Sequence, residues 1–457
     1  MTDLATGART APTPAPAPAP RIPPGPRRGA RLPGLAFVAN RRRAAQRMRR
    51  RYGPTFTLQL PFWGRTVFLG EPALVKQLLT SSPELIGSTE PNLGRVLGPG
   101  SFFNLDGEDH KRQRKLLLPP FHGRRVQSYE GIFEQETRRV TAGWPEGEPF
   151  PTQDSMLRIT LNVMLRAVFG AQGEEFDALG RLLPPMVTLG SKLTLMPGSN
   201  IDLGRLSPRG RFRAYRSEFD AIIDRLIATA RADPDLDRRN DILALMLQAR
   251  YEDGTAMEPR AVADQLLTLL AAGHETTAIT LAWAIERLRR HPEVLARLAA
   301  EADEGGSQLR KAAVIEVQRT RSVVDLTGRR IQGESLALGE WVLPHGCTVM
   351  LAMGLIHEDD SVFPNAAAFD PDRFVGVNPD TYSWLPFGGG TRRCIGAAFA
   401  AMEMDVVLRT LLRDFVIAPT DEPDEKWYSR GVAWAPKRGG VAVVHRRREP
   451  ADEGGAA

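Results

Sequence analysis

The chain has 457 residues, of which 42% are hydrophobic and 25% are charged. This ordinary globular composition excludes a fibrous protein and a chain that is disordered throughout. Two cysteines, Cys347 and Cys394, are too few for a disulfide scaffold or for a structural zinc site built on several thiolates. The net charge is +6, yet residues 1–51 hold twelve arginines and one acid, so the remaining residues sum to −5. We therefore expect no binding to nucleic acid through a basic fold.

The N-terminal segment, residues 1–51, is rich in proline and arginine. Residues 1–33 contain nine prolines and a repeated AP pair, which predicts a polyproline-like or disordered segment that does not pack. Residues 41–51 predict at most a short basic helix, which would either contact an anionic surface or partner or form a solvated face. No apolar run reaches the roughly 18 residues of a transmembrane helix, and no signal-peptide core is present. We therefore expect no transmembrane anchor and a cytoplasmic location.

Hydrophobic periodicity outlines the rest of the chain in order. Residues 54–70 predict two short strands around a turn, and helical patterns dominate from about residue 71 to 300. The expected helices are Glu71–Leu79, Gly107–Leu118, Phe212–Ala232, Ile242–Ala249, Pro259–Arg290 and Ile395–Asp414. The helix from Pro259 would be about 48 Å long, enough to cross a domain. Residues 329–355 predict short strands. We expect one domain over 52–446 and a polar tail over 447–457.

A glycine-rich loop precedes the last of these helices. It runs from Pro386 to Gly396, PFGGGTRRCIG, and carries three consecutive glycines before Cys394. Glycine lets a backbone turn tightly and approach a flat ligand. A cysteine at a helix N-terminus is favoured as a thiolate by the exposed amides and the helix dipole. Such a thiolate suits an axial ligand to haem iron, although a lone cysteine can also be a buried structural residue.

The loop follows the pattern F-x-x-G-x-R-x-C-x-G at every fixed position. This pattern resembles the haem-binding signature of the cytochrome P-450 family of haem-thiolate monooxygenases. The resemblance implies a mainly α fold with small β-sheets, a long central helix over the haem and a small β-rich subdomain. It also implies haem b as cofactor, with Cys394 as the axial iron ligand. The loop residues expected to contact the haem are Phe387, Gly388, Arg392, Cys394 and Gly396, with Arg392 on a propionate.

The expected long helix carries an unusual segment, AGHETT, from Ala272 to Thr277. A glycine inside a helix costs about 1 kcal/mol relative to alanine, so a groove that opens locally or a kink with a polar patch is expected. The segment is similar to the oxygen-activation motif A-G-x-[DE]-T-T of the same family. By that resemblance Thr276 would hydrogen-bond the bound oxygen and Glu275 would help to relay protons, with Ala272 and Gly273 beside the haem. His274 falls on the variable position and is expected to be a packed helix residue.

A predicted structural triad joins two further segments. Glu316 and Arg319 share one helical face, and by the resemblance they pair with Arg373 of the segment FDPDRF. The family often has proline three residues after this arginine. Ser322 stands there, at the border of the substrate cavity, so we expect an unusual pocket. Cys347 and His357, in contrast, are expected to be structural.

Three more residues are candidates for the haem propionates. His110 and Arg114 lie four apart on one helical face, which alone indicates no more than a basic helix turn. Their segment resembles the family helix that holds a propionate, a role for which bidentate arginine is well suited. Arg329 is a further candidate.

The resemblance implies insertion of one atom of O2 into a C–H bond of an apolar small molecule, such as a fatty acid, terpenoid, steroid or polyketide. The expected pocket segments, residues 85–105, 183–205, Val323–Leu326 and the helix before Gly273, are rich in apolar residues. No dinucleotide fingerprint follows a strand and no cysteine set could hold an iron–sulfur cluster. A separate ferredoxin or flavodoxin with its reductase is therefore expected as electron donor. Lys111, Arg112, Lys115 and Arg393 would form its docking patch on a monomeric enzyme.

Two alternatives remain open at this stage. One is a haem-thiolate enzyme that uses peroxide or rearranges an oxygenated substrate. The other is a haem-binding sensor without turnover. The intact Glu275–Thr276 pair favours the monooxygenase, because proton delivery needs such a relay.

Overall fold

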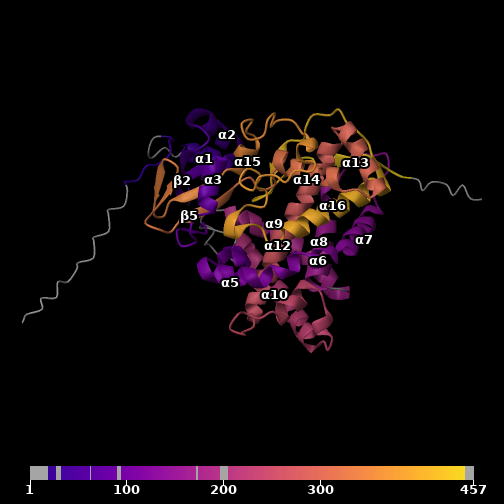
Figure 1. Ribbon diagram of the computed structural model, residues 1–457. Coiled ribbons are helices and arrows are strands. Elements are labelled where there is room, and N and C mark those ends of the chain that lie inside the picture. Colours follow the sequence, from indigo (N-terminus) through magenta and orange to yellow (C-terminus); the bar gives the residue numbers. More distant parts are fainter. Residues whose placement is uncertain are drawn as a thin grey trace, which may run out of the picture.

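Helices make up most of the molecule, and a smaller β-rich part lies at one side, next to α1 and α2 (Figure 1). The computed structural model describes residues 19–26, 32–61, 63–89, 94–170, 173–195 and 204–447. The predicted fold class, mainly α with small β-sheets, is confirmed. The helices are α1 (Leu32–Ala39), α2 (Arg41–Tyr52), α3 (Pro72–Leu79), α4 (Gly94–Leu97), α5 (Gly107–Leu117), α6 (Arg124–Gln127), α7 (Glu130–Thr141), α8 (Gln153–Phe169), α9 (Gly173–Leu195), α10 (Pro208–Ala232), α11 (Ile242–Gln248), α12 (Pro259–Leu288), α13 (Pro292–Glu304), α14 (Gln308–Thr320), α15 (Met353–His357) and α16 (Ala397–Asp414).

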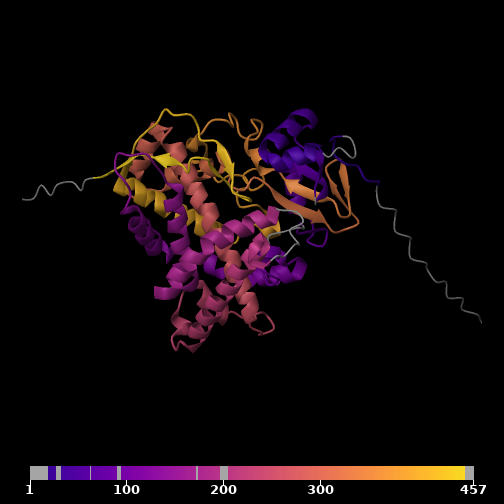
Figure 2. The same ribbon diagram turned by 180° about the vertical axis from the view of Figure 1, so that it is seen from behind.

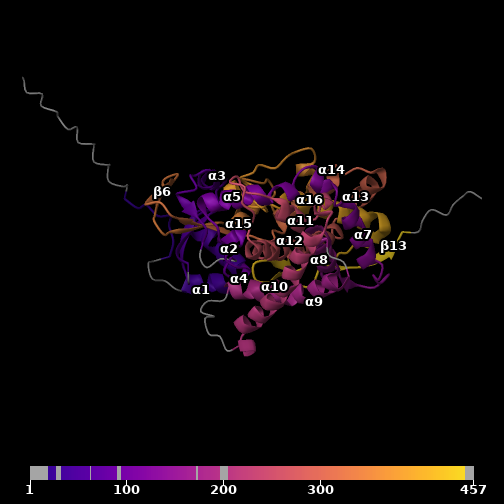
Figure 3. The same cartoon turned by 90° about the horizontal axis from the view of Figure 1, so that it is seen from below.

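The longest of these helices, α12, crosses the centre of the helical part (Figure 3). It begins at Pro259, whose fixed φ and missing N–H suit the first position of a helix. An added Cβ at Gly273 would lie 2.9 Å from Met164 Cε of α8, and Thr160 Oγ1 of α8 donates to the His274 carbonyl at 2.9 Å. The glycine therefore permits close packing of α8. Helix α12 is continuous through these residues.

The β-rich part is built around one sheet of five strands in the order β1-β2-β8-β5-β3. Strands β1 and β2 form the predicted hairpin, and β8 then pairs in parallel with β2, so that Val67 lies opposite Val349. This pairing joins segments that are far apart along the chain, and the antiparallel pairing of β5 with β8 places Arg329 opposite Val349. The strands are β1 (Phe56–Leu60), β2 (Gly64–Leu69), β3 (Ile86–Gly87), β4 (Phe150–Pro151), β5 (Thr327–Ile331), β6 (Ser335–Leu338), β7 (Trp341–Pro344), β8 (Thr348–Leu351), β9 (Phe415–Ile417), β10 (Trp427–Ser429), β11 (Trp434–Pro436), β12 (Val441–Ala442) and β13 (Val444–Arg446).

Part of the N-terminal segment is packed, contrary to the expectation for residues 1–33. Arg21 and Val342 of β7 exchange backbone hydrogen bonds of 3.0 and 2.8 Å, and Thr57 of β1 donates to the Pro24 carbonyl at 2.8 Å. Free backbone groups at the edges of β7 and β1 thus take up an extended, proline-rich segment. Residues 1–18, 27–31 and 448–457 lie outside the described residues. The expected basic helix is present as α2.

The C-terminal strands return across the helical part on the side seen in Figure 2. Trp283 of α12 donates its indole N–H to the Trp434 carbonyl of β11 at 3.0 Å. Strand β11 therefore lies against the C-terminal part of the central helix. None of the described helices is both long and apolar enough to cross a bilayer.

Candidate active site

The loop before α16 holds Cys394 in a tight turn. Gly388 and Gly390 have φ values of +63° and +65°, in the left-handed region that favours glycine. The Cys394 N–H donates to the Phe387 carbonyl at 2.9 Å, which closes the turn. The side chain of Cys394 is accessible, three residues before α16 begins at Ala397.

The surroundings of the Cys394 thiol act in opposite directions on its pKa. Burial among protein atoms raises the pKa, while the Gly396 N–H and the guanidinium groups of Arg114 and Arg393 lower it. The net direction is upward, although a cysteine at a helix N-terminus was expected to favour the thiolate. Desolvation is the largest of these influences and outweighs the Gly396 N–H and the two guanidinium groups.

Four basic side chains converge beside this loop. His110 of α5 is buried, and burial together with Arg392, Arg114 and Arg329 lowers its pKa to about 3. Arg329 of β5 is also buried, and burial and the nearby Arg392 lower its pKa to about 10. Arg392 pairs with Asp106, and Arg114 donates to the Arg393 carbonyl at 2.7 Å. Positive charge is thus concentrated beyond what Asp106 neutralises, which makes the cluster a site for an anion.

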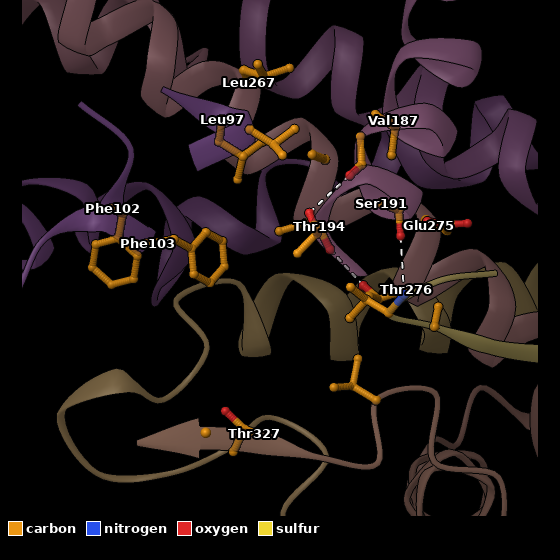
Figure 4. Close-up of a pocket in the computed structure, with 18 of the residues that line it drawn as sticks. Leu97, Phe102, Phe103, Val187, Ser191, Thr194, Leu267, Glu275, Thr276 and Thr327 are labelled. Carbon is orange, nitrogen blue, oxygen red and sulfur yellow. Dashed lines mark hydrogen bonds between the residues drawn. The ribbon is translucent and has the colours of Figure 1, made fainter. Parts of the chain in front are cut away.

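A cavity of about 410 Å³ lies between α12, α9, β5 and the loops around them. Figure 4 shows Phe102 and Phe103 on one side of it, and Ser191 and Glu275 on the other. Ala272 is exposed although most of α12 is buried, and Thr276 Oγ1 donates to the Ala272 carbonyl at 2.8 Å. The apolar or partly apolar side chains that line the cavity include Val96, Leu97, Phe102, Phe103, Met186, Val187, Thr194, Phe212, Leu267, Ala271, Val324, Leu326, Val432 and Ala433.

A second cavity, of about 420 Å³, meets the first at Glu275 and Val187. Its lining also includes Asp154 and Arg158 of α8, whose side chains are exposed. Glu275 is buried and its Oε1 accepts from Arg430 Nε at 2.7 Å. The carboxylate of Glu275 thus stands between an inner cavity and one that reaches the surface of the protein.

A comparison with known families identifies the chain. The Cytochrome P450 family model matches residues 23–443. The chain belongs to the cytochrome P450 family. It is 52% identical over 447 residues to cytochrome P450 138 of Mycobacterium bovis and of Mycobacterium tuberculosis, covering 98% of this chain and 100% of each relative. It is 37% identical over 438 residues to cytochrome P450 135B1 of Mycobacterium tuberculosis, covering 94% of this chain and 92% of that protein.

Solved structures confirm the predicted P450 fold. The retinoic-acid-bound cyanobacterial CYP120A1 superposes with a TM-score of 0.82 at 24% identity, covering 94% of this chain and 100% of that one. The haem domain of cytochrome P450DA superposes with a TM-score of 0.80 at 23% identity, covering 93% and 98%. The protein is therefore a P450 enzyme, a haem-thiolate monooxygenase of a bacterial type.

The residues of the site fit a haem on three independent grounds. Apart from chain neighbours, no described atom lies within 4 Å of a Cβ built on Gly388 or Gly396, so a flat ligand can lie against both. Among the described residues His110 Nε2 finds no hydrogen-bond partner although it is buried, and it lies in the cationic cluster, where a carboxylate would satisfy it. Cys394 supplies an accessible sulfur next to the cluster.

The predicted triad assembles as expected. Arg319 donates to both carboxylate oxygens of Glu316 at 2.7 and 2.6 Å, and Arg373 Nε lies 3.4 Å from Glu316 Oε1. Arg319 also donates to the carbonyls of His357, Ala366 and Ala368, each at 2.8 Å. The ion pair is fully buried, so these bonds to three carbonyls are what satisfies the guanidinium.

Ser322 itself lies in the core, whereas Val324 and Leu326 of the same loop line the cavity, and the unusual pocket stays a prediction. The Ser322 hydroxyl donates to the Gln318 carbonyl at 2.9 Å and lies 2.8 Å from His357 Nδ1. The Leu385 N–H donates to His357 Nε2 at 3.1 Å, which leaves Nδ1 to carry the proton toward Ser322. His357 is thus a structural residue that connects α14 to the start of the cysteine loop.

The sequence pattern missed several residues of the site. Arg430, Val432 and Ala433 come from the turn between β10 and β11, where no motif marks them.

Three of the four residues expected to form a basic docking patch are paired with acids: Lys111 with Glu108, Arg112 with Asp253 and Lys115 with Glu252. Glu108 lies three residues before Lys111 on α5, so local spacing could have revealed that pair, whereas Asp253 and Glu252 come from a distant turn that charge periodicity on α5 could not reveal.

The turn at Gly390 predicts a specific sensitivity to substitution. An added Cβ would lie 2.7 Å from the Leu79 carbonyl oxygen, and φ is positive. Gly376 also has a positive φ, +69°, yet no described atom crowds it. We expect Gly376→Ala to lower the free energy of unfolding by about 1 to 2 kcal/mol, and Gly390→Ala to lower it clearly further. Urea unfolding of both variants checks this, and equal losses would contradict it.

The buried imidazole of His357 predicts a pH dependence of stability. Burial and the nearby Arg319 and Arg42 lower its pKa to about 3, so only the unfolded chain takes up a proton between pH 6.5 and that value. The free energy of unfolding therefore decreases as pH falls through this range, by about 2 kcal/mol between pH 7 and pH 5. We expect His357→Gln to lose about that much less over the same interval, measured by urea unfolding of the holoprotein. His445→Gln, an exposed control, should follow the parent protein.

Proposed function

We propose that the enzyme hydroxylates an apolar small molecule, such as a fatty acid, terpenoid, steroid or polyketide, with haem b as cofactor and O2 as co-substrate. The observation that carries this proposal is the cavity of about 410 Å³ against the middle of α12. Its lining is mainly apolar, and burial of apolar surface is the main source of affinity for such a ligand. Few polar groups, among them Thr276 and Ser191, are available to orient it.

The roles of the haem-binding residues follow from the chemistry of the group. When bound, haem supplies the activation of dioxygen and the oxidation of a C–H bond. Cys394 would hold the iron through its sulfur. His110, Arg114, Arg329 and Arg392 would bind the propionates, whose negative charges offset the repulsion inside the cationic cluster. Phe387, Gly388 and Gly396, together with Ala272 and Gly273 of α12, would lie against the ring.

Proton delivery would run through Glu275 and Thr276. Glu275 stands at the junction of the two cavities, and the outer cavity reaches exposed residues of α8. A carboxylate there can take up protons from the outer side and release them on the inner side. The Thr276 hydroxyl, on the next residue of α12, can pass a proton on, since it both donates and accepts hydrogen bonds.

The electrons would come from a separate ferredoxin or flavodoxin with its reductase. The sequence given holds two cysteines and no dinucleotide fingerprint after a strand, which supports a separate electron donor. With the lysines of α5 paired to acids, the exposed Arg393 beside Cys394 is the remaining cation of the expected patch. We also propose a monomer in the cytoplasm, where the free thiols of Cys347 and Cys394 would suit a reducing compartment.

Thiolate ligation predicts the spectrum of the reduced protein under carbon monoxide. We expect the Soret band characteristic of a thiolate opposite carbon monoxide in the parent protein. The band should be lost in Cys394→Ala and kept in Cys347→Ala, because Cys347 is buried among apolar side chains of the sheet core. A parent spectrum typical of a histidine or neutral ligand would contradict the assignment of Cys394.

The proposed proton relay predicts that substitution of Thr276 uncouples the consumption of electrons from the formation of product. In the presence of a substrate found by its spin-state shift, we expect the parent enzyme to place one atom of isotopically labelled dioxygen in the product. Thr276→Ala should keep substrate binding and the carbon monoxide spectrum but lower the product formed per electron by about a hundredfold. Thr280→Ala, one turn along α12, is the matched control, since among the described residues its hydroxyl bonds only the Thr276 carbonyl. Equal turnover with peroxide and without reductant would favour a peroxide-using enzyme instead.

A further inference from the structure

Helix α1 has an exposed face that is entirely apolar. Leu32, Leu35 and Val38 have 80%, 53% and 58% of their surface exposed, and they recur every three residues on one side of the helix. Gly34 and Phe37 on the other side are buried against β1 and β2. The whole helix, LPGLAFVA, has no polar side chain. An exposed apolar patch of this kind indicates a site that binds a protein, a membrane or a ligand.

Helix α2 follows α1 directly and carries seven arginines without an acid. Arg41, Arg42 and Arg49 pair with Asp325, Glu358 and Asp359 of the body. In contrast, the exposed arginines form no ion pair within the described part of the chain; these are Arg43, Arg47, Arg50 and Arg51. Their spacing of three to four residues places them along one side of α2. The inner side of the helix is thus neutralised by the protein, while its outer side is not.

The two helices lie next to each other at one side of the molecule (Figure 3). Asn40 joins them, and its side chain accepts from the Arg43 N–H at 3.1 Å as the N-cap of α2. Phe37 packs edge-on against Phe68 of β2 with the ring centroids 5.0 Å apart. Arg41 Nε bonds Asp325 at 3.0 Å. An apolar face and a row of unpaired cations are therefore presented together and without a flexible linker.

We propose that α1 and α2 form a docking surface for an anionic lipid membrane. The apolar side chains of α1 would enter the boundary between headgroups and acyl chains, while the arginines of α2 bind lipid phosphates. A symmetric contact between two copies of the chain would bring these cations against each other, which charge repulsion opposes. An acidic protein would neutralise the arginines but leave the purely apolar face of α1 without a matching partner group. A membrane with anionic lipids satisfies both features at once.

The test measures binding of the holoenzyme to lipid vesicles. Vesicles with phosphatidylglycerol and vesicles of phosphatidylcholine alone are sedimented with the protein, at low and high salt. We expect binding to the anionic vesicles that salt weakens. The triple variant R43E/R47E/R50E and the double variant L35E/V38E should each lower the partition coefficient at least about tenfold. Both alter exposed side chains, and an unchanged carbon monoxide spectrum would show that the enzyme remains folded.

A matched control carries the same change of charge elsewhere. The variant R211E/R225E/R231E reverses three exposed arginines of α10, and we expect it to bind like the parent enzyme. The proposal is overturned by an absence of binding to anionic vesicles, or by an equal loss in the α10 variant. It is also overturned if the parent enzyme forms a dimer in solution that L35E/V38E abolishes, because the apolar face of α1 would then be an interface between copies.

Discussion

The buried ion pair of Glu316 and Arg319 is the constraint on which the haem side of the molecule depends. Neither side chain is exposed, and a buried charge is tolerated only when each of its polar atoms is bonded. Arg319 therefore gathers three backbone carbonyls from the chain between His357 and Ala368, and Glu316 accepts the Asp370 N–H at 2.9 Å. These bonds fix the irregular chain that leads toward the cysteine loop. Removal of one partner would leave an unpaired charge in the core.

His357 extends this network to the loop itself. Its two ring nitrogens bond Ser322 on one side and the Leu385 N–H on the other, so the start of the loop is tied to the end of α14. The turn that follows depends on glycine for its left-handed conformation and for its close approach to α3. The position of Cys394 is thus set by a chain of polar contacts that begins more than seventy residues earlier, at Glu316.

The cationic cluster at the site is unfavourable for the stability of the protein alone. Three guanidinium groups surround His110 and lower its pKa, and a buried nitrogen of that imidazole lacks a partner among the described residues. Such repulsion is unfavourable in the protein alone and is offset when an anion binds.

Arginine serves three distinct purposes in this protein: it forms a buried ion pair in the core, an anion site at the cavity, and an outward row on α2. Its fixed charge and forked donors suit each of them.

The sequence by itself determined the family, the cysteine loop, the central helix and the Glu316–Arg319 pair, because each depends on residues that are close along the chain. Local spacing also predicted the β1–β2 hairpin. It did not reveal the partner of Glu275, since Arg430 lies 155 residues away on a turn without a motif. Nor did it reveal the parallel pairing of β2 with β8, the pairing of α5 with the distant acids Glu252 and Asp253, or the packing of residues 19–26. Those features were decided by the tertiary structure alone, because they depend on which distant segments meet when the apolar core is buried.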